Sequence, residues 1–290
     1  MSFIAFIIIY PILFLISILP FRLLYFFSDF VYFLIYYIIG YRKKVVRANI
    51  ALALPHLSEK ERLIIEKKSY QHLCDMFLEM IKTMSISGKE IEERFVFSNL
   101  EIINELEKKD KSIALMCAHY ASYEWVISMN ERVSYQGFAI YKKVNNPYFD
   151  KLVKKIRSRF KAYLITTKET RSVIEQNESK GNHAIYGFAS DQSPQVKPQT
   201  YWSKFMGIEV PVYIGAEVLS KKYDMNVVFL KVKKVKRGFY QADIELISDN
   251  VNSIPDYQIT ETFLRKVEKQ IHEAPEFYLW THKRWKHRRL

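Results

Sequence analysis

A histidine followed by a carboxylate is the part of this sequence best suited to catalysis. His119 comes directly after the apolar run of residues 113–118, and Glu124 follows it five positions later. A histidine at the end of a buried strand can take a proton from an acceptor hydroxyl when a carboxylate fixes its tautomer. We expect Glu124 to accept a hydrogen bond from one ring nitrogen, which leaves the other facing the substrate. The same spacing also arises by chance, so a structural role for the pair stays open.

Asp191 and Arg157 are the next candidates. Asp191 closely follows the apolar run of residues 184–189, which is typical of a second buried strand. In open α/β sheets, ligands bind outside the carboxyl ends of the strands, where both His119 and Asp191 are expected. Arg157, in a basic helical stretch, could stabilise the oxyanion of a thioester intermediate. Asp191 could hold Arg157 or only cap the next segment, and Arg157 could equally belong to a solvated basic face.

Strand-like and helix-like patterns alternate along residues 42–290. Ser58 and Glu61 have the spacing of a capping box at the start of a helix. We expect strands at residues 112–118, 138–141, 163–166, 184–189, 227–235 and 240–247, and helices at residues 42–54, 58–84, 99–109, 122–132, 147–160, 168–178, 213–223 and 260–272. This alternation predicts an α/β fold: a single domain with a largely parallel central sheet flanked by helices.

The N-terminus is expected to contact a membrane. Residues 3–19 are uncharged and long enough to span a bilayer, which takes roughly 17–25 residues. They lack the basic start and small-residue cleavage site of a signal peptide. The second apolar run, residues 21–39, is rich in Phe and Tyr and either lies in the interface or packs under the domain. Arg42, Lys43 and Lys44 then place the following domain in the cytoplasm. We therefore divide the chain into a membrane anchor and interfacial segment (1–40) and a cytoplasmic domain (41–290).

The charge balance narrows the choice of partners. The chain carries 44 Lys and Arg against 31 Asp and Glu, a net charge of +13. Such a field attracts acidic headgroups, nucleic acid or an acidic carrier protein. The apolar N-terminus and the lack of a nucleic-acid motif argue against nucleic acid. The histidines have no metal-ligand spacing, so no metal site is predicted. Cys74 and Cys117 lie in apolar contexts, which favours buried thiols over a disulfide framework or a nucleophile.

Five sequence blocks, in order, resemble a known family. They are residues 41–50, 119–125, 141–159, 189–192 and 275–286. Together they are similar to the bacterial lipid A biosynthesis late (secondary) acyltransferases, the lauroyl/myristoyl transferase group within the His-x4-Asp/Glu glycerolipid-type acyltransferases. The resemblance spans nearly the whole chain, and the ordered set is far more specific than any one block.

The resemblance implies roles for individual residues. His119 matches the catalytic base, Glu124 its partner, Arg157 the essential arginine and Asp191 the aspartate of an Asp-Gln block. Within the same blocks we expect substrate-binding residues at Lys142, Arg159, Gln192 and Arg284. Members of the family take acyl groups from acyl carrier protein, use no metal or organic cofactor, and lie at the cytoplasmic face of the bacterial inner membrane. The resemblance also implies a glycerolipid-acyltransferase-like domain behind one N-terminal membrane helix.

The predicted function is transfer of a fatty acyl chain to a hydroxyl of a lipid A precursor. The chain departs from the family at residues 120–123 and after Gln192, where the usual glycine-bearing turn is missing. These positions are where an acceptor headgroup could bind, so other acceptors stay open: a lysophospholipid, an aminolipid, or a polyene or pigment lipid. A catalytically silent, membrane-tethered binding protein is the alternative from another class. Neither the acyl chain length nor the oligomeric state follows from the sequence.

Overall fold

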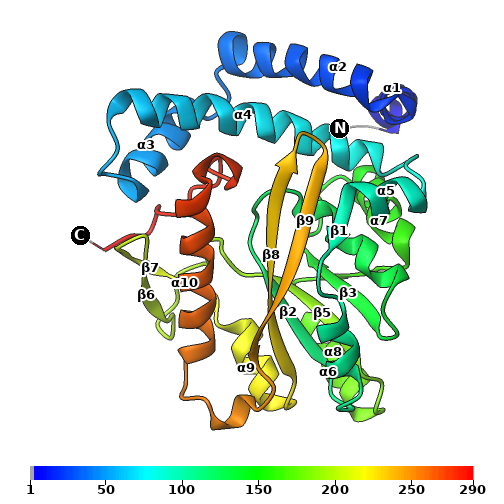
Figure 1. Cartoon of the computed structure of the whole chain (residues 1–290), viewed down its shortest axis with the longest axis vertical. Helices are drawn as coiled ribbons and strands as arrows, with labels where there is room; N and C mark the ends of the chain where they lie inside the picture. The colour runs from blue at the N-terminus through cyan, green and yellow to red at the C-terminus, as the bar shows by residue number, and fades with distance from the viewer. Residues whose placement is uncertain (1–2, 290) are drawn as a thin grey trace.

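The computed structural model describes residues 3–289, which form one mixed α/β domain (Figure 1). The α-helices are α1 (Phe3–Ile18), α2 (Phe21–Phe33), α3 (Lys43–Ala53), α4 (Glu59–Lys82), α5 (Gly88–Arg94), α6 (Glu101–Glu107), α7 (Pro147–Arg157), α8 (Thr170–Ser179), α9 (Gly215–Lys222) and α10 (Gln258–Glu273). The π-helix η1 (Leu34–Ile39) continues α2, and the 3-10 helices are η2 (Tyr123–Glu131), η3 (Ser158–Phe160), η4 (Val251–Ser253) and η5 (Pro275–Phe277).

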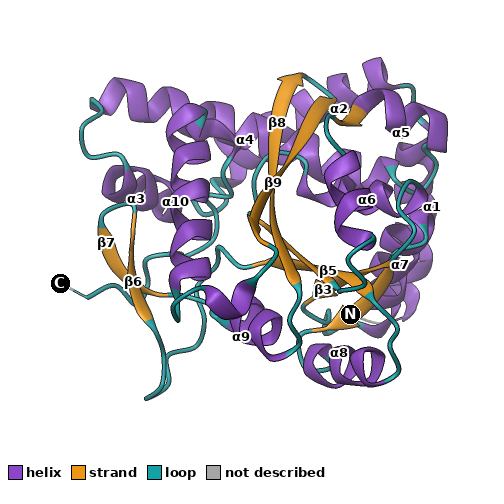
Figure 2. Ribbon diagram, turned by 60° about the horizontal axis from the view of Figure 1, so that its bottom comes forward, coloured by secondary structure: helices purple, strands orange, loops and turns teal. Residues whose placement is uncertain are grey.

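The described residues form one large sheet and one small one. The large sheet has seven strands in the order β1-β9-β8-β2-β5-β3-β4. Its neighbours are parallel except for the antiparallel pair β8 and β9. The strands are β1 (Phe95–Phe97), β2 (Ile113–Cys117), β3 (Gln136–Tyr141), β4 (Tyr163–Thr166), β5 (Ala184–Ala189), β8 (Asn226–Lys236) and β9 (Phe239–Ser248), with β6 (Trp202–Phe205) and β7 (Ile208–Pro211) forming the second sheet. Helices flank the large sheet (Figure 2). The predicted fold class is confirmed.

Strand β2 lies at the centre of this sheet because its sequence is apolar on both faces. Every residue of β2 is buried, and it pairs in parallel with β5 on one side and β8 on the other. A parallel strand covered on both faces has a continuous apolar run rather than an alternating pattern. The run before His119 therefore predicted the buried strand correctly, and its central place is a finding of the structure.

The N-terminal helices form a layer over α4. Figure 1 shows α2 lying along α4, with the β8–β9 hairpin reaching up to the same layer. By length and composition, one helical stretch among residues 3–289 could cross a membrane, and it is Phe21–Ile39, which joins α2 and η1. The expected spanning segment, residues 3–19, instead contains the shorter apolar helix α1. The sequence therefore predicted two apolar runs at the N-terminus correctly, and that residues 3–19 span a membrane stays a prediction.

Several elements differ from the prediction in type or were not predicted. The capping box at Ser58 and Glu61 is present at the start of α4. The helix expected over residues 122–132 is the 3-10 helix η2, which has tighter turns. Strands β1, β6 and β7 were not expected, because runs of three or four residues give only a weak periodic pattern; the four-residue β4 was the exception.

Candidate active site

The register of two central strands brings His119 and Asp191 together. In the parallel pair of β2 and β5, Cys117 lies opposite Ala189. His119 and Asp191 each follow two residues after these partners, so both leave the sheet at the same edge. This is the edge at which open α/β sheets place their ligands.

Asp191 holds His119 through both its ring and its backbone. The Asp191 Oδ1 atom lies 2.7 Å from His119 Nδ1 and accepts the His119 backbone N–H at 3.0 Å. Since an ionised carboxylate can only accept, the ring proton lies on Nδ1, which leaves the Nε2 lone pair free. The Asp191 side chain is only 1% exposed and that of His119 is 20% exposed. The arrangement is that of a general base with its orienting carboxylate.

The pair shifts both pKa values toward the charged forms. Burial by itself would lower the pKa of His119, but the neighbouring Asp191 carboxylate outweighs it and the pKa is raised above 6.5. Burial would likewise raise the pKa of Asp191, but His119 outweighs it and the pKa is lowered. Asp191 is therefore ionised at neutral pH, and the ring is a stronger base than a free histidine.

Glu124 binds Arg157 rather than the histidine. Arg157 Nε donates to Glu124 Oε2 at 2.8 Å, and Arg157 Nη2 donates to Oε1 at 2.5 Å. This bidentate geometry fixes the plane of the guanidinium. Burial would lower the pKa of Arg157, but the Glu124 carboxylate outweighs it and the pKa is raised. Both groups act on the charge of His119, since Glu124 raises and Arg157 lowers its pKa.

Two sequence expectations about these side chains are therefore wrong. Within residues 3–289 no hydrogen bond joins Glu124 to His119, and Asp191 takes the place at Nδ1 that the sequence assigned to Glu124. Asp191 does not bind Arg157, which Glu124 binds instead. The physical reason is the strand register, which places Asp191 beside the ring, whereas Glu124 lies in the following 3-10 helix and is directed at the end of α7.

His119 lies in a narrow groove between α4 and the C-terminal segment. Residues 69–76 of α4 supply one wall, residues 277–281 supply the other, and His119 and Tyr123 lie between them. The Tyr123 ring meets the His119 ring edge-on, with 4.9 Å between centroids. Apart from His119 and His72, this lining is mostly aromatic and aliphatic. The groove thus suits an apolar chain next to a basic nitrogen.

The C-terminal segment is fixed to the histidine loop by backbone contacts. Leu279 N–H donates to His119 O, and Ala121 N–H donates to Phe277 O. Ala121 has a φ of 48°, in the left-handed region that residues with a β-carbon rarely adopt. Such strain persists where neighbouring contacts fix it, which is common at functional sites.

Residues of α3 and of the preceding turn hold the same C-terminal segment from the other side. Asn49 Nδ2 donates to the carbonyl oxygens of Trp280 and His282, and Arg42 Nη1 donates to Thr281 O. His282 Nε2 accepts the backbone N–H of Ser193 at 3.2 Å. Burial lowers the pKa of His282 to about 4, so it is neutral and can accept this bond. The first and last of the five blocks therefore meet beside His119.

Among the described residues, the side chains of the four predicted substrate-binding residues form no hydrogen bond with His119 or Asp191 and do not line the groove. Lys142 is exposed in the loop after β3, and Gln192 is half-buried next to Asp191. Arg159 donates from Nη2 to Ile86 O at 2.7 Å and from Nη1 to Met84 O. Arg284 is buried and donates to Pro211 O at 3.1 Å, which ties the C-terminal segment to β7. Their roles in binding substrate stay predictions.

The thiols of Cys74 and Cys117 are both buried, and burial raises the pKa of each to about 12. A thiol that stays protonated at neutral pH is a poor nucleophile.

Sequence reasoning missed the roles of His282 and Asn49, which position the groove wall rather than touch the reacting atoms. No local spacing indicates them, because each contacts a segment far away in the chain. The His119–Asp191 pairing did carry a signal, since each residue stands just after an apolar run that predicted a buried strand, and the carboxyl ends of such strands share one edge of the sheet.

A histidine held by a buried carboxylate, at the carboxyl edge of a parallel sheet and beside an apolar groove, suits group transfer to a hydroxyl. The chain belongs to the bacterial lipid A biosynthesis acyltransferase family, whose model matches residues 2–287. The protein is therefore an acyltransferase with a lipid acceptor, as the sequence predicted.

Curated relatives agree with this family. The chain is 24% identical over 249 residues to the lipid A biosynthesis lauroyltransferase of Escherichia coli, covering 85% of this chain and 80% of that protein. It is 23% identical over 252 residues to the lipid A biosynthesis palmitoleoyltransferase of the same organism, covering 85% and 79%. A lipid A biosynthesis acyltransferase of Haemophilus influenzae is 22% identical over 253 residues, covering 85% and 78%.

Proposed function

We propose that this acyltransferase moves a fatty acyl chain from acyl carrier protein to a hydroxyl of a lipid A precursor. The observation that carries the proposal is the His119–Asp191 pair, in which Asp191 holds Nδ1 and leaves Nε2 available beside an apolar groove. The family and its relatives support the acceptor class, and the net charge of +13 suits an acidic carrier protein as donor.

In the proposed reaction the acceptor hydroxyl attacks the carbonyl carbon of the donor thioester. His119 Nε2 removes the hydroxyl proton as the carbon–oxygen bond forms, and Asp191 stabilises the imidazolium that results. The tetrahedral intermediate then expels the carrier thiolate, which takes the proton from His119. The products are an ester and a free thiol, and no metal or redox step is needed.

The Glu124–Arg157 pair has a separate role in this proposal. Glu124 fixes the Arg157 guanidinium from one side, and the remaining N–H groups can stabilise the oxyanion or bind an anionic group of either substrate. Glu124 thus acts through Arg157 as a positioning residue. We assign Lys142, Arg159, Gln192 and Arg284 only to the wider binding surface.

We further propose that residues 1–40 attach the enzyme to the bacterial inner membrane and that residues 41–290 act at its cytoplasmic face. The apolar helices α1 and α2 support the attachment, and the cations at residues 42–44 support the orientation. A donor in the cytoplasm and an acceptor in the membrane would meet at this location.

The test is acyl transfer by the purified full chain in detergent, with acyl carrier protein thioesters and a lipid A precursor. We expect an acylated precursor from wild type and none from H119A, and an unchanged rate from H56A, which replaces an exposed histidine outside the groove.

Mass spectrometry of lipids from cells with and without the gene then identifies the acceptor. Unchanged lipid A together with loss of another acylated lipid would move the assignment to that lipid. Wild-type protein that binds acyl carrier protein but forms no product would instead favour the non-catalytic binding protein.

A further inference from the structure

The stretch Phe21–Ile39 is apolar in composition but amphipathic in the structure. The side chains of Leu23, Phe26, Phe30, Phe33 and Tyr37 recur every three or four residues and are each at least half exposed, Phe26 most of all at 76%. The polar side chains Tyr25, Ser28, Asp29 and Tyr36 recur with similar spacing and each bonds to the protein, although the Asp29 side chain is 54% exposed. Residues three or four apart share one face of a helix, so the stretch has an apolar outer face and a polar inner face.

The inner face is bound to α4 by hydrogen bonds along its length. Tyr25 OH donates to Glu79 Oε1 and Ser28 Oγ donates to Asp75 Oδ1, both at 2.8 Å. At the other end Tyr36 OH donates to Glu66 Oε1 at 2.9 Å. The three acceptor side chains are each at most 2% exposed. The stretch is therefore fixed alongside α4, antiparallel to it, at both ends and in the middle.

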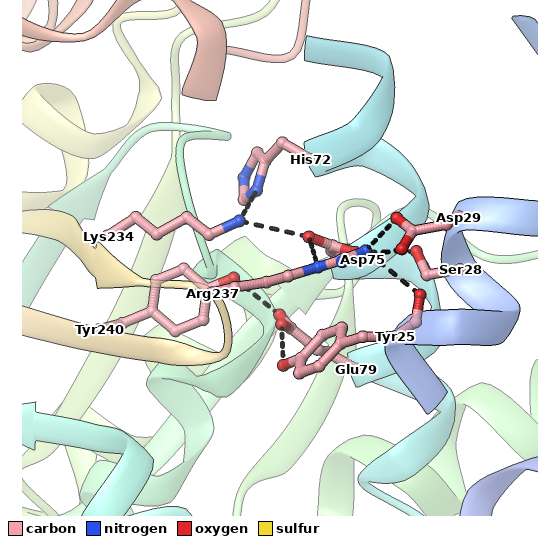
Figure 3. A network of polar contacts seen from close by, with 9 residues as sticks. All are labelled: Tyr25, Ser28, Asp29, His72, Asp75, Glu79, Lys234, Arg237 and Tyr240. Carbon is pink, nitrogen blue, oxygen red and sulfur yellow. Dashed lines mark hydrogen bonds and ion pairs between the residues drawn. The ribbon is translucent and has the colours of Figure 1, made fainter. Parts of the chain in front are cut away.

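Arg237, at the tip of the β8–β9 hairpin, bridges the two helices (Figure 3). Its guanidinium is 2.6 Å from Asp29 Oδ1 on α2 and 2.7 Å from Asp75 Oδ1 on α4. The next residue, Gly238, has a φ of 76°, and a β-carbon there would lie 2.0 Å from Tyr25 OH. The hairpin turn is thus shaped to fit directly against α2.

A spanning orientation of Phe21–Ile39 would dismantle these contacts. Asp29 and Ser28 would enter the hydrocarbon without partners, and Asp75 and Glu66 would each lose a hydrogen-bond donor. Unpaired buried polar groups cost about 1–3 kcal/mol each, and more when charged. The two helix stretches therefore satisfy their polar groups only when they lie side by side.

Charges flank the apolar outer face at both ends. Arg22 at the start of α2 and Arg42 and Lys44 just after η1 are exposed. Asp29, which Arg237 binds, is the single acidic residue between positions 20 and 50. An anionic lipid surface complements this pattern, because both ends would lie at headgroup level and the ring-rich face between them would enter the acyl region. A second copy of the chain would present cations to cations.

We propose that Phe21–Ile39 lies flat in the membrane interface, with its outer face in lipid and its inner face clamped to the enzyme by Arg237. The helix α1 extends the same layer, with Ile8 and Leu15 each 60% exposed. Residues 69–76 of α4, directly beneath, form one wall of the groove that leads to His119. The bilayer would thus lie about one helix diameter, roughly 10 Å, from that groove wall. This inference rests on the proposed membrane location but not on the reaction.

The depth of spin labels tests the orientation. Single cysteines at positions 26, 30, 33 and 37 of the full chain are labelled and measured on vesicles of phosphatidylethanolamine and phosphatidylglycerol. The native thiols are buried with pKa values raised to about 12, so unsubstituted protein serves as the labelling blank. A label at Lys180, exposed at the far end of α8, is the aqueous control.

We expect four similar, shallow depths and an aqueous signal at position 180. A spanning helix would separate positions 26 and 37 by about 16 Å along its axis, so a steady gradient of depth would overturn the proposal. Aqueous accessibility at all four positions, or dipolar broadening from a second copy, would overturn it as well. Acyl transfer by the same labelled chains is assayed separately, so that loss of catalysis is distinguished from a wrong orientation.

Discussion

The protein contains two buried polar clusters, one around His119 and one between α2, α4 and the β8–β9 hairpin, and they differ in how exposed their histidine is. At the active site Asp191 binds His119 Nδ1, and within residues 3–289 no group binds Nε2. Between α2, α4 and the β8–β9 hairpin, Asp75 accepts from Ser28, Lys234 and Arg237, and Glu79 accepts from Tyr25 and Tyr240. Both clusters contain buried carboxylates. The first leaves Nε2 free on a histidine that is 20% exposed, whereas the atom without a partner among the described residues of the second, His72 Nε2 beside Lys234, is buried.

The cluster around His119 suits a reaction, whereas the cluster around Asp75 holds α2 and α4 together. A buried network whose carboxylates all have partners fixes the arrangement of its elements, and opening it leaves charges without partners. A site with one free, oriented nitrogen is ready to accept a proton. Substitutions in the first cluster should therefore change the rate of acyl transfer, whereas those in the second should change stability and helix position.

The largest expected effect is that of removing the base. We expect H119A to lower the rate of acyl transfer by roughly 10³–10⁴-fold, because no other described side chain can take the proton at this position. The free energy of unfolding of H119A should also fall, because Asp191 stays buried without the ring as its partner, so rates are compared under conditions in which both proteins are folded. Near-normal transfer by H119A in the purified assay, with H56A as the control, would end the proposed mechanism.

The next effect tests which carboxylate orients His119. We expect D191N to lower the rate by roughly 10²–10³-fold because the tautomer is no longer fixed. Since neutral His119 is the active form and Asp191 raises its pKa above 6.5, activity should rise with pH through that raised pKa. In D191N the carboxylate that raises this pKa is gone, so the remaining activity should begin to rise at a lower pH than in wild type.

The matched variant E124Q separates the two pairs. It keeps the shape of Glu124 but weakens the bidentate hydrogen bonds to Arg157, so we expect a lower rate of acyl transfer. The pH at which activity rises should shift less than in D191N. The comparison is made from rates measured across pH for both variants. If the pH at which activity rises shifted more in E124Q than in D191N, Glu124 rather than Asp191 would orient the histidine, as the sequence first suggested.

The sequence predicted the strands at the site better than the contacts between side chains. The continuous apolar runs before His119 and Asp191 predicted β2 and β5 because central parallel strands are buried on both faces. The partner of His119 could not be read from spacing, since Asp191 reaches it through the register of two strands 72 residues apart in the chain. A rule based on neighbours in sequence therefore favoured Glu124.

Local composition also could not show how the N-terminus packs. Residues 3–19 are the more apolar run and form α1, which ends at Ile18, whereas the longer helical stretch is the one that contains Asp29. The partners that make Asp29 and Ser28 acceptable lie on α4 and in the β8–β9 hairpin, up to 208 residues away. No window of sequence contains that information.

The second cluster should respond to loss of Arg237 in stability. We expect R237A to lower the free energy of unfolding by about 1–3 kcal/mol, because Asp75 stays buried with fewer donors. The label depths on α2 should also become unequal as its hold on the body weakens. K236A, which removes the neighbouring exposed lysine, is the control, and equal stability of the two variants would show that Arg237 is no clamp.

The smallest effect concerns the charge of Glu79. Burial, opposed by Lys234, raises the pKa of Glu79 from 4.5 to about 7. Between these values the folded protein binds a proton that the unfolded chain has released, so stability should fall as pH rises, by at most about 1.4 kcal/mol per pH unit. E79Q removes this titration, and its denaturant unfolding should be flatter from pH 5 to 7 than that of wild type. E105Q, on the exposed surface, should keep the wild-type slope. If E79Q kept that slope too, Glu79 would be ionised in the folded protein over this pH range. The cluster between α2, α4 and the β8–β9 hairpin would then differ from the one around His119 only in the exposure of its histidine.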